Sequence, residues 1–179
     1  MSKNPPSATV PLKLRPLQAN DLPALLEIQL ACYGPDFIEH EAVYARRLAS
    51  AANCSLVAER DGRVCGYLAA YQSAQGKVTP LHGDFENPQG PPDTLYLHDM
   101  AVSPVHAGQG MARALLEALW ARGRAAGVLR TALVSVQDSQ GYWSRHGYLP
   151  QLLDDAQERA RLASYGDGAI YMVRPLDPA

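Results

Sequence analysis

Apolar residues recur at two different spacings along the first half of the chain, and each spacing predicts one type of secondary structure. A helical spacing at 21–32, with Asn20 as its cap, predicts a first helix, and a similar pattern predicts a second helix at 39–51. Strand-like apolar runs occur at 12–17, 54–60 and 64–72. The Asp61-Gly62 pair between the last two runs is typical of a tight turn, so we expect an antiparallel hairpin there.

The second half of the chain opens with an apolar run at 94–102, "TLYLHDMAV". This run is apolar on both faces except at His98 and Asp99, as expected for a central strand that is covered on both sides. An apolar stripe then predicts a helix at 111–126, which Gly127 ends. The remaining pattern predicts a strand at 128–136, a short helix that Asp138 or Ser139 caps and Gly147 ends, an extended segment at 148–152, a helix at 154–164 and a strand at 169–175.

Strands and helices therefore alternate, and the fold class that we predict is α/β with a mixed sheet. Residues 73–93 interrupt this order with many Gly, Pro and Asn residues, in a segment too long for an ordinary connection. Such a segment favours a functional loop near a site. We expect one domain at 12–179, preceded by a flexible tail at 1–11.

Composition narrows the class of protein mainly by exclusion. The 179 residues are 47% hydrophobic with a formal net charge of −2 and no long Lys/Arg run, which disfavours nucleic acid and membranes as partners. No apolar stretch is long enough to span a membrane and the start lacks a signal-peptide pattern, so we expect a cytoplasmic protein. Cys32, Cys54 and Cys65 are widely spaced, which favours reduced thiols over disulfides or a zinc site. A homodimer is compatible with these data.

Two glycines lie at the start of the helix that follows the central strand. The sequence there is "HAGQGMARALL", with Gly108 and Gly110. A strand, a glycine turn and a helix start make an anion site, because the first N–H groups of a helix have no partner inside it. A Walker loop needs Lys and Ser/Thr where Met111 and Ala112 stand, and a dinucleotide fingerprint needs glycine in place of Arg113. The loop therefore favours a phosphate compound other than a nucleoside triphosphate or a nicotinamide cofactor.

The stretches "MAVSPVHAGQGMARALL" and "GYWSRHGY" resemble the acyl-CoA loop and a later helix of the GNAT superfamily of N-acetyltransferases, and the resemblance covers nearly the whole chain. Family members carry Gln or Arg at the position of Ala107, whereas Gly110 and Ala112 match the family's pattern. Losing that one side chain should weaken binding only modestly, because main-chain N–H groups hold the pyrophosphate. The resemblance implies a GNAT-like fold, with a mixed sheet splayed between its fourth and fifth strands and helices on both faces.

The resemblance further implies acetyl-CoA as a co-substrate and no metal. The pantetheine arm would lie along the splayed edge of the central strand, where Met100 and Val102 supply main-chain groups. The coenzyme-binding residues that the resemblance and the loop indicate are Met100, Ala101, Val102, Ala107, Gly108, Gln109, Gly110, Met111, Ala112, Arg113, Ser139 and Trp143.

Acyl transfer to an amine requires that the ammonium lose a proton before it attacks the thioester. Histidine is the side chain whose ordinary pKa lies nearest neutrality, so His98 is the candidate base, directly or through a water. By strand alternation, Tyr96, His98, Met100 and Val102 share one face. Arylalkylamine-type members, the nearest resemblance in this strand, have pocket bases at the positions of Tyr96 and His98. The alternative is that His98 is a satisfied core residue.

The departing thiolate benefits from gaining a proton. The family's tyrosine position holds Trp143, whose indole cannot donate a proton usefully, and Tyr142 lies one position earlier, about 100° around the helix. The proton therefore comes from Tyr142 or from water. The alternative role of Tyr142 is that of a packed aromatic residue.

Aromatic residues elsewhere in the chain suggest a pocket for the acceptor, formed by Tyr33, Phe37, Tyr71 and Tyr165. The predicted function is N-acetyl transfer from acetyl-CoA to a primary amine of a small molecule, by direct attack on the thioester. Two alternatives stay open: an acyl-CoA-binding regulatory module without turnover, and an acetyltransferase of a protein N-terminus or lysine.

Overall fold

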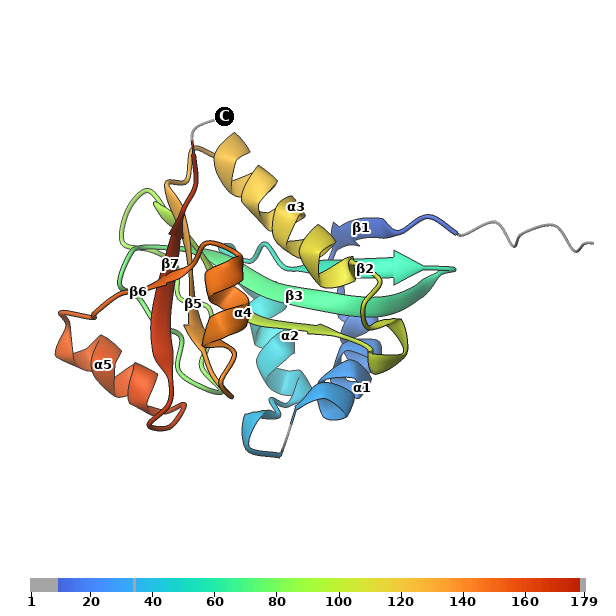
Figure 1. The fold of residues 1–179 in the computed structure, drawn as a ribbon, viewed down its shortest axis with the longest axis horizontal. Helices are drawn as coiled ribbons and strands as arrows, with labels where there is room; N and C mark the ends of the chain where they lie inside the picture. The colour runs from blue at the N-terminus through green and yellow to red at the C-terminus, as the bar shows by residue number, and fades with distance from the viewer. Residues whose placement is uncertain (1–9, 34, 178–179) are drawn as a thin grey trace, which may run out of the picture.

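The computed structural model describes residues 10–33 and 35–177, and within them one seven-stranded sheet carries helices on both faces (Figure 1). The strand order is β1-β2-β3-β4-β5-β7-β6. β4 and β5 run parallel, and every other neighbouring pair is antiparallel. The predicted α/β class with a mixed sheet is confirmed.

The elements follow the order that the hydrophobic pattern predicts, with shorter helices than expected. The strands are β1 Lys13–Pro16, β2 Leu56–Arg60, β3 Arg63–Ser73, β4 Thr94–Val102, β5 Arg130–Ser135, β6 Leu149–Pro150 and β7 Ile170–Pro175. The α-helices are α1 Leu22–Cys32, α2 Glu41–Ala49, α3 Met111–Ala125, α4 Gln140–Arg145 and α5 Ala156–Ala163, and three 3₁₀ turns are η1 Ala19–Asp21, η2 Pro35–Phe37 and η3 Pro104–His106.

Four residues with positive φ stand where the sequence predicts a turn or a helix end. Asp61 and Gly62 have φ of 53° and 71°, as a two-residue hairpin turn between β2 and β3 requires. Gly127 after α3 has φ of 69°, and Gly147 after α4 has φ of 83°. Both helix ends therefore use glycine in the left-handed conformation that other residues avoid.

The start of α1 differs from the prediction, because Asn20 does not cap it. Asn20 lies inside η1, and the N-cap of α1 is Asp21. The carboxylate of Asp21 accepts the N–H of Gln18 at 2.8 Å and two bonds from the guanidinium of Arg15 at 2.7 and 2.8 Å. An ion pair with β1 thus fixes the entry to the helix. At α4 the predicted position is right, since Ser139 is the N-cap, but its side chain makes no capping bond.

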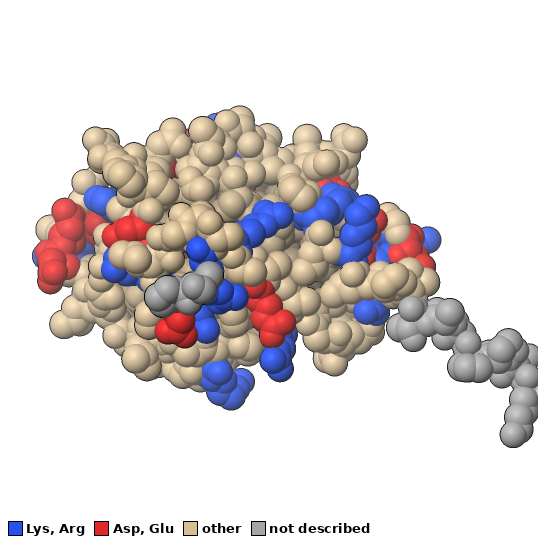
Figure 2. All heavy atoms as spheres, turned by 90° about the horizontal axis from the view of Figure 1, so that it is seen from above, with Lys and Arg blue, Asp and Glu red and all other residues tan. Residues whose placement is uncertain are grey.

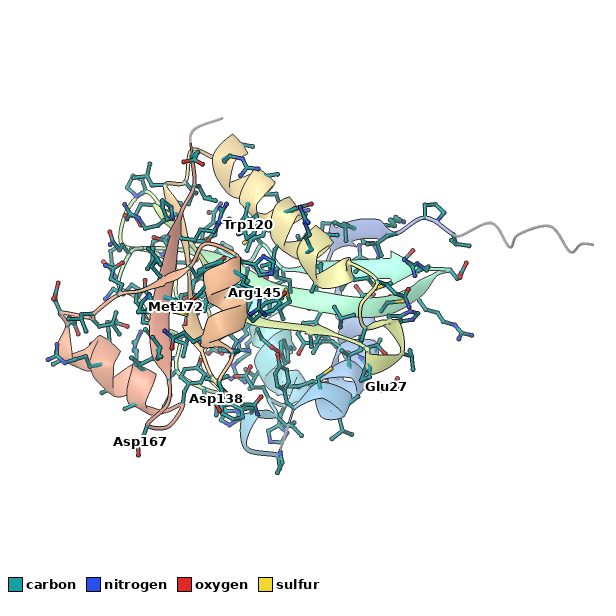
Figure 3. The ribbon with its side chains drawn as sticks, viewed as in Figure 1. Glu27, Trp120, Asp138, Arg145, Asp167 and Met172 are labelled. Atoms are coloured by element: carbon teal, nitrogen blue, oxygen red, sulfur yellow. The ribbon has the colours of Figure 1, made fainter. Side chains whose placement is uncertain are left out.

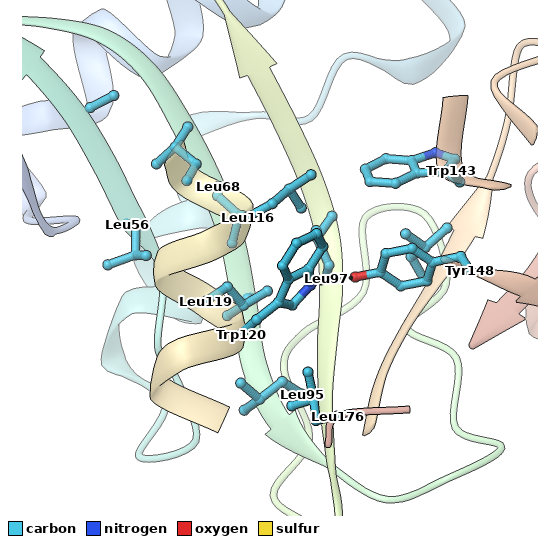
Figure 4. Close-up of a cluster of buried hydrophobic side chains, with 14 of the residues drawn as sticks. Leu56, Leu68, Leu95, Leu97, Leu116, Leu119, Trp120, Trp143, Tyr148 and Leu176 are labelled. Atoms are coloured by element: carbon cyan, nitrogen blue, oxygen red, sulfur yellow. Dashed lines mark hydrogen bonds between the residues drawn. The ribbon is translucent and has the colours of Figure 1, made fainter. Parts of the chain in front are cut away.

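Two apolar clusters fill the space on either side of the sheet. The cluster under α3 includes Leu116, Leu119 and Trp120 and extends to Trp143 of α4 (Figure 4). The cluster on the opposite face packs α1 and α2 against the sheet through residues such as Leu25 and Tyr44. The sheet is therefore the middle layer of three.

β4 and β5 separate partway along their length. Their parallel pairing joins Thr94–Leu97 to Arg130–Leu133 and ends there, although β4 continues to Val102. Beyond Leu97, β4 has a strand partner only on its β3 side among the residues that the structure describes. The predicted splay between the fourth and fifth strands is confirmed.

β4 also contains a β-bulge at His98, which alternation in the sequence does not reveal. Ala69 of β3 faces Asp99, whereas the next residue, Ala70, faces Leu97. His98 is thus an extra residue in β4, and an extra residue shifts the alternation of faces by one position.

The bulge corrects the prediction that four alternate residues of β4 share one face. Tyr96 belongs to the cluster under α1 and α2, and the ring of His98 lies beside it, with centroids 6.4 Å apart. Met100 and Val102 pack instead against the cluster under α3. Asp99 points to the α1–α2 face, where three tyrosine hydroxyls contact its carboxylate.

The long loop predicted between β3 and β4 spans 74–93 and is fixed to the helices around it. The N–H of Val78 donates to Glu158 of α5 at 2.8 Å. The carbonyl of Gly83 accepts two bonds from Arg47 of α2, at 3.0 and 2.8 Å. The loop is therefore a structured wall of the domain rather than a free connection.

Most of the tail predicted at 1–11 lies outside the described residues. Among the helices of the described part, none is long and apolar enough to cross a membrane.

Candidate active site

A cavity of about 380 Å³ opens where β4 and β5 separate. One side is formed by the free part of β4, and another by α4, whose last residue, Arg145, is labelled in Figure 3 together with Asp138, two residues before the helix begins. The predicted site residues that line the cavity are His98 and Tyr142, then Met100, Ala101, Val102, Ala112, Ser139 and Trp143, and then Tyr33, Phe37 and Tyr165. The structure therefore gathers candidates from distant parts of the chain around one space.

Among the residues predicted for catalysis or for the acceptor pocket, Tyr96 and Tyr71 are not part of this wall. Tyr96 is 1% exposed, and burial raises the pKa of its hydroxyl well above the ordinary range. Tyr71 is 2% exposed, accepts a hydrogen bond from Thr79 at 2.7 Å and stacks on Phe85. Both rings lie under the site as core residues, because the sheet is covered on this face. Tyr71 is thus removed from the predicted acceptor pocket.

The glycine loop precedes α3 with its main chain open. Gly108 and Gly110 have φ of 74° and 77°, and a Cβ built on either glycine would meet nothing within 4 Å. The first helical bond at this end runs from the N–H of Ala114 to the carbonyl of Gly110. In the part of the chain that the structure describes, the N–H groups of Gly108, Gln109 and Gly110 have no partner. These donors and the first turn of α3 form the anion site that the sequence predicts.

The side chains of the loop take different positions. Met111 is buried in the core, and Ala107 is exposed. Arg113 is exposed and pairs with Glu117 one turn along α3. Gln109 accepts a hydrogen bond from Arg60 at the end of β2. Arg60 thus brings a guanidinium to the loop, and its buried Nε has no partner among the described residues.

The free edge of β4 presents main chain to the cavity. The carbonyl of Met100 accepts a bond from the Tyr33 hydroxyl at 2.8 Å, and the carbonyl of Val102 accepts one from the Cys32 thiol at 3.3 Å. His98 is partly exposed as a residue although its side chain is only 2% exposed, so its backbone is the exposed part. Side chains near the end of α1, rather than a strand, contact this edge.

His98 belongs to a buried charge cluster that sequence spacing could not show. Its Nε2 lies 2.9 Å from Oε2 of Glu39, a side chain that is 3% exposed. Arg47 of α2 bonds both oxygens of Glu39, at 2.5 and 2.6 Å. Burial raises the pKa of Glu39, but His98 and Arg47 outweigh burial and hold that pKa well below its ordinary value. Glu39 therefore stays ionised and fixes one ring nitrogen of His98 as a donor.

The other ring nitrogen of His98 faces a tyrosine. Nδ1 lies 3.4 Å from the hydroxyl oxygen of Tyr165, which donates to the carbonyl of Thr79 at 2.6 Å. Burial raises the pKa of the Tyr165 hydroxyl. Tyr165 lines the cavity, and the imidazole that its hydroxyl faces is buried, so this side chain connects the cavity with Nδ1.

Tyr142 and Trp143 form the α4 side of the cavity. Trp143 is 9% exposed, and its Nε1 donates to the hydroxyl of Ser139 at 3.1 Å. Burial raises the pKa of the half-buried Tyr142 hydroxyl, so the group keeps its proton at neutral pH. Ser139 also contacts the hydroxyl of Ser135 at 3.0 Å. Trp143 and Ser139 thus fasten this wall, while Tyr142 keeps a protonated hydroxyl at the cavity.

Sequence reasoning missed Asp99, which three tyrosines hold at the cavity wall. Tyr33 donates to its Oδ1 at 2.7 Å, and Tyr44 donates to its Oδ2 at 2.7 Å. Tyr67 also contacts Oδ2. These partners lie 66, 55 and 32 positions away in the sequence. The only signal in the sequence is a charged residue inside an otherwise apolar strand.

Charge on the face seen from above gives no second candidate. Most of this face is uncharged, and its Lys and Arg side chains lie near Asp and Glu side chains (Figure 2). In residues 10–33 and 35–177, no group of three or more His, Cys, Asp or Glu side chains is arranged to hold a metal ion.

Comparison with known proteins identifies the family of this fold. Residues 22–148 match the family model described as the acetyltransferase (GNAT) family. No curated protein sequence matches the chain closely enough to add a relative.

Comparison with solved structures shows that other proteins share this fold. The ribosomal-protein-S18-alanine N-acetyltransferase from Escherichia coli is 19% identical with a TM-score of 0.68, and the match covers 94% of this chain and 96% of that one. PaiA N-acetyltransferase from Thermoplasma acidophilum, in complex with coenzyme A, is 14% identical with a TM-score of 0.59, over 92% and 98% of the two chains. A GNAT family acetyltransferase from Brucella melitensis, in complex with acetyl-CoA, is 22% identical with a TM-score of 0.58, over 93% and 89%.

Proposed function

The chain belongs to the GNAT acetyltransferase family, and we propose that it transfers an acetyl group from acetyl-CoA to a primary amine of a small molecule. One observation carries the proposal: β4 separates from β5 after Leu97, and the free edge leads directly into the glycine loop and the start of α3. An amide-bearing arm fits a free strand edge, and a diphosphate fits a helix N-terminus. Coenzyme A has both parts.

The residues present fit this coenzyme. The N–H groups of Gly108 to Gly110 are available for a diphosphate, and no side chain blocks the space above either glycine. Arg60 stands beside the loop through its bond with Gln109. This guanidinium supplies positive charge beside Gln109, in the loop where the family has Gln or Arg at the position of Ala107. Acetyl-CoA would supply the activated acetyl group at the β4 edge.

His98 is the proposed base, and the geometry gives it a route to the acceptor. Glu39 accepts from Nε2, so in the neutral imidazole the free lone pair is on Nδ1. The hydroxyl of Tyr165 faces Nδ1 and the cavity. The ammonium can therefore give its proton to the Tyr165 oxygen while the Tyr165 proton leaves the Thr79 carbonyl and moves to Nδ1. The imidazolium that results lies against the Glu39 carboxylate, which stabilises it.

Protonation of the thiolate has two routes that the structure leaves available. Tyr142 lines the cavity with a hydroxyl that burial keeps protonated. Water is the other donor, and we favour it slightly because Trp143 stands at the family's tyrosine position.

The anchored loop between β3 and β4 supports a small acceptor. Leu81 of this loop and Tyr165 line the cavity, and Arg47 and Glu158 hold the loop in place. A protein segment would need more open space at this end.

One screen tests the proposal: release of free CoA from acetyl-CoA by the pure protein, against amines, amino acids and peptides. We expect release with small amines and an acetylated product in the same mixture. Saturable coenzyme binding without transfer to any acceptor would favour a regulatory module instead, and transfer only to peptides would favour a protein acetyltransferase.

A further inference from the structure

The wall of the cavity contains two carboxylates and no fixed cation. Glu39 and Asp99 line it, whereas no Lys or Arg among the described residues does. A buried or half-buried carboxylate is costly unless it is hydrogen-bonded and paired with a positive charge. We therefore ask which of these two carboxylates lacks a hydrogen-bond donor or a cationic partner within the protein.

Both carboxylate oxygens of Glu39 already have hydrogen-bond partners, and one of these partners is a cation. Arg47 bonds both of its oxygens from outside the cavity, His98 contacts Oε2, and the N–H of His82 donates to Oε1 at 2.7 Å. A ligand cation therefore has little to gain from Glu39.

Asp99 is hydrogen-bonded but has no cationic partner among the described residues. Its Oδ2 receives the hydroxyls of Tyr44 and Tyr67, two side chains that are at most 1% exposed and lie away from the cavity. Its Oδ1 receives only the hydroxyl of Tyr33, which has one proton and also contacts the carbonyl of Met100 at 2.8 Å. Oδ1 is thus short of a donor on the side where Tyr33 lines the cavity.

We propose that Asp99 anchors the ammonium group of the acceptor, and that the cavity thereby selects cationic amines without a carboxylate of their own. The inference rests on the proposed acetyl transfer and names the class of its acceptor. An ammonium at Oδ1 supplies both the missing donor and the missing positive charge. The tyrosines hold the carboxylate in place before the ligand arrives, so little reorganisation is needed on binding.

The same charges exclude acidic acceptors. The carboxylate of an amino acid would meet Asp99 and Glu39 in a space where the described part of the chain places no Lys or Arg to balance it. The rest of this end is apolar or aromatic, with Phe37, Leu81 and Tyr165. A primary amine with an apolar body fits these walls.

Calorimetry with three ligands of one shape tests the inference. The probes are 2-phenylethylamine, 2-phenylethanol, which lacks the charge, and L-phenylalanine, which adds a carboxylate. Each is titrated into the wild-type protein with and without saturating coenzyme A. We expect the amine to bind at least about 30-fold more tightly than the other two, the usual effect of a desolvated charge pair. Equal binding of amine and alcohol, or no binding of the amine in either titration, would overturn the inference.

Two variants locate the effect. Asp99→Asn keeps the shape and removes the charge, so the preference for the amine over the alcohol should disappear. Glu27→Gln removes an exposed charge on α1, labelled in Figure 3, and should keep the preference. A preference that survives in Asp99→Asn would contradict the assignment, and the wild-type titrations stand even if that variant does not fold. Amine preference without any heat from coenzyme A would keep the amine site and refute the proposed acetyl transfer.

Discussion

At the scale of single residues, the catalytic proposal depends on how His98 is held. The imidazole is buried, with Glu39 on one nitrogen and Tyr165 near the other. This arrangement differs from a histidine that merely fills a core, because a carboxylate held by Arg47 fixes one ring nitrogen as a donor and a tyrosine hydroxyl faces the other. If His98 were only a core residue, replacing it would change the stability of the protein but not the pH dependence of its activity.

We expect His98→Ala to lower turnover on the best amine by about 10²-fold, the usual size of a general-base contribution. Acetyl-CoA affinity should change little, since the coenzyme meets the main chain of β4. Steady-state rates and their pH profile check this, with His40→Ala as the control, because His40 is exposed and does not line the cavity. If both variants keep the wild-type rate and pH profile, His98 is a core residue.

Substitutions at two neighbouring positions distinguish the two possible donors of the thiolate proton, Tyr142 and water. If Tyr142 is the donor, Tyr142→Phe should slow the chemical step and leave coenzyme affinity intact, because only a hydroxyl is lost. If water is the donor, Tyr142→Phe should be nearly silent. Trp143→Phe should then weaken coenzyme binding through lost contact area and the lost bond to Ser139. Single-turnover transfer by both variants decides between the routes.

Local signals made many residues predictable. Asp61-Gly62, Gly127 and Gly147 were recognised because each turn or helix end requires a conformation that few residues adopt. Glu39 and Asp99 were not, since their partners are far away in the sequence: 59 positions separate Glu39 from His98, and 66 separate Tyr33 from Asp99. Only the folded chain brings such residues together.

At the scale of elements, β4 and α3 carry the site, and the bulge in β4 determines which side chains lie on which face of the sheet. Alternation predicted one face for Tyr96, His98, Met100 and Val102, but the extra residue at His98 sends the last two to the α3 side. The period of a strand is visible in a sequence, whereas a single inserted residue is visible only in its pairing.

The glycine loop gives a prediction with a control at the other end of the same helix. Gly110 and Gly127 flank α3, both have positive φ, and both have open space where a Cβ would stand. Alanine at either position should cost about 1 kcal/mol of stability through backbone strain. Only Gly110→Ala should also weaken acetyl-CoA binding, by about tenfold, because its methyl group intrudes on the anion site.

Calorimetry measures that affinity, and urea unfolding measures the strain. Equal affinities in the two glycine variants would mean that the coenzyme phosphates do not lie on this loop.

At the scale of the whole molecule, the buried Glu39–Arg47 pair joins α2, the loop at 74–93 and β4. Arg47 also bonds the carbonyl of Gly83, and Glu39 bonds His98. A pair of this kind is strongly destabilising when one partner is removed, because the other remains charged and buried. The pair thus makes the site depend on the fold of the entire domain.

The pH dependence of stability follows from the same pair. The pKa of Glu39 lies below its ordinary value of 4.5, and bonds from Arg15 lower the pKa of Asp21. A carboxyl with a lowered pKa stabilises the fold above its unfolded pKa, and this contribution is lost as the pH falls toward the folded value. We therefore expect the free energy of unfolding to decrease as the pH falls below about 4.5.

Glu39→Gln tests the size of this effect. At neutral pH it should lower the free energy of unfolding by about 3 kcal/mol, because Arg47 is left without its partner. It should then lose less stability in acid than the wild type. Urea unfolding at several pH values measures both, with the exposed Glu27→Gln as control. A wild-type stability that is independent of pH in acid would contradict the account.

The central claim is that acetyl-CoA lies along the free edge of β4 with its phosphates on the glycine loop. At 19.4 kDa the protein suits amide NMR, and a titration with coenzyme A reports each N–H separately. We predict saturable shifts concentrated at Gly108, Gln109, Gly110 and Ala112 and along Met100–Val102, with little change at Gly127 at the far end of α3. Saturable shifts confined to other surfaces, or none at all, would contradict the claim.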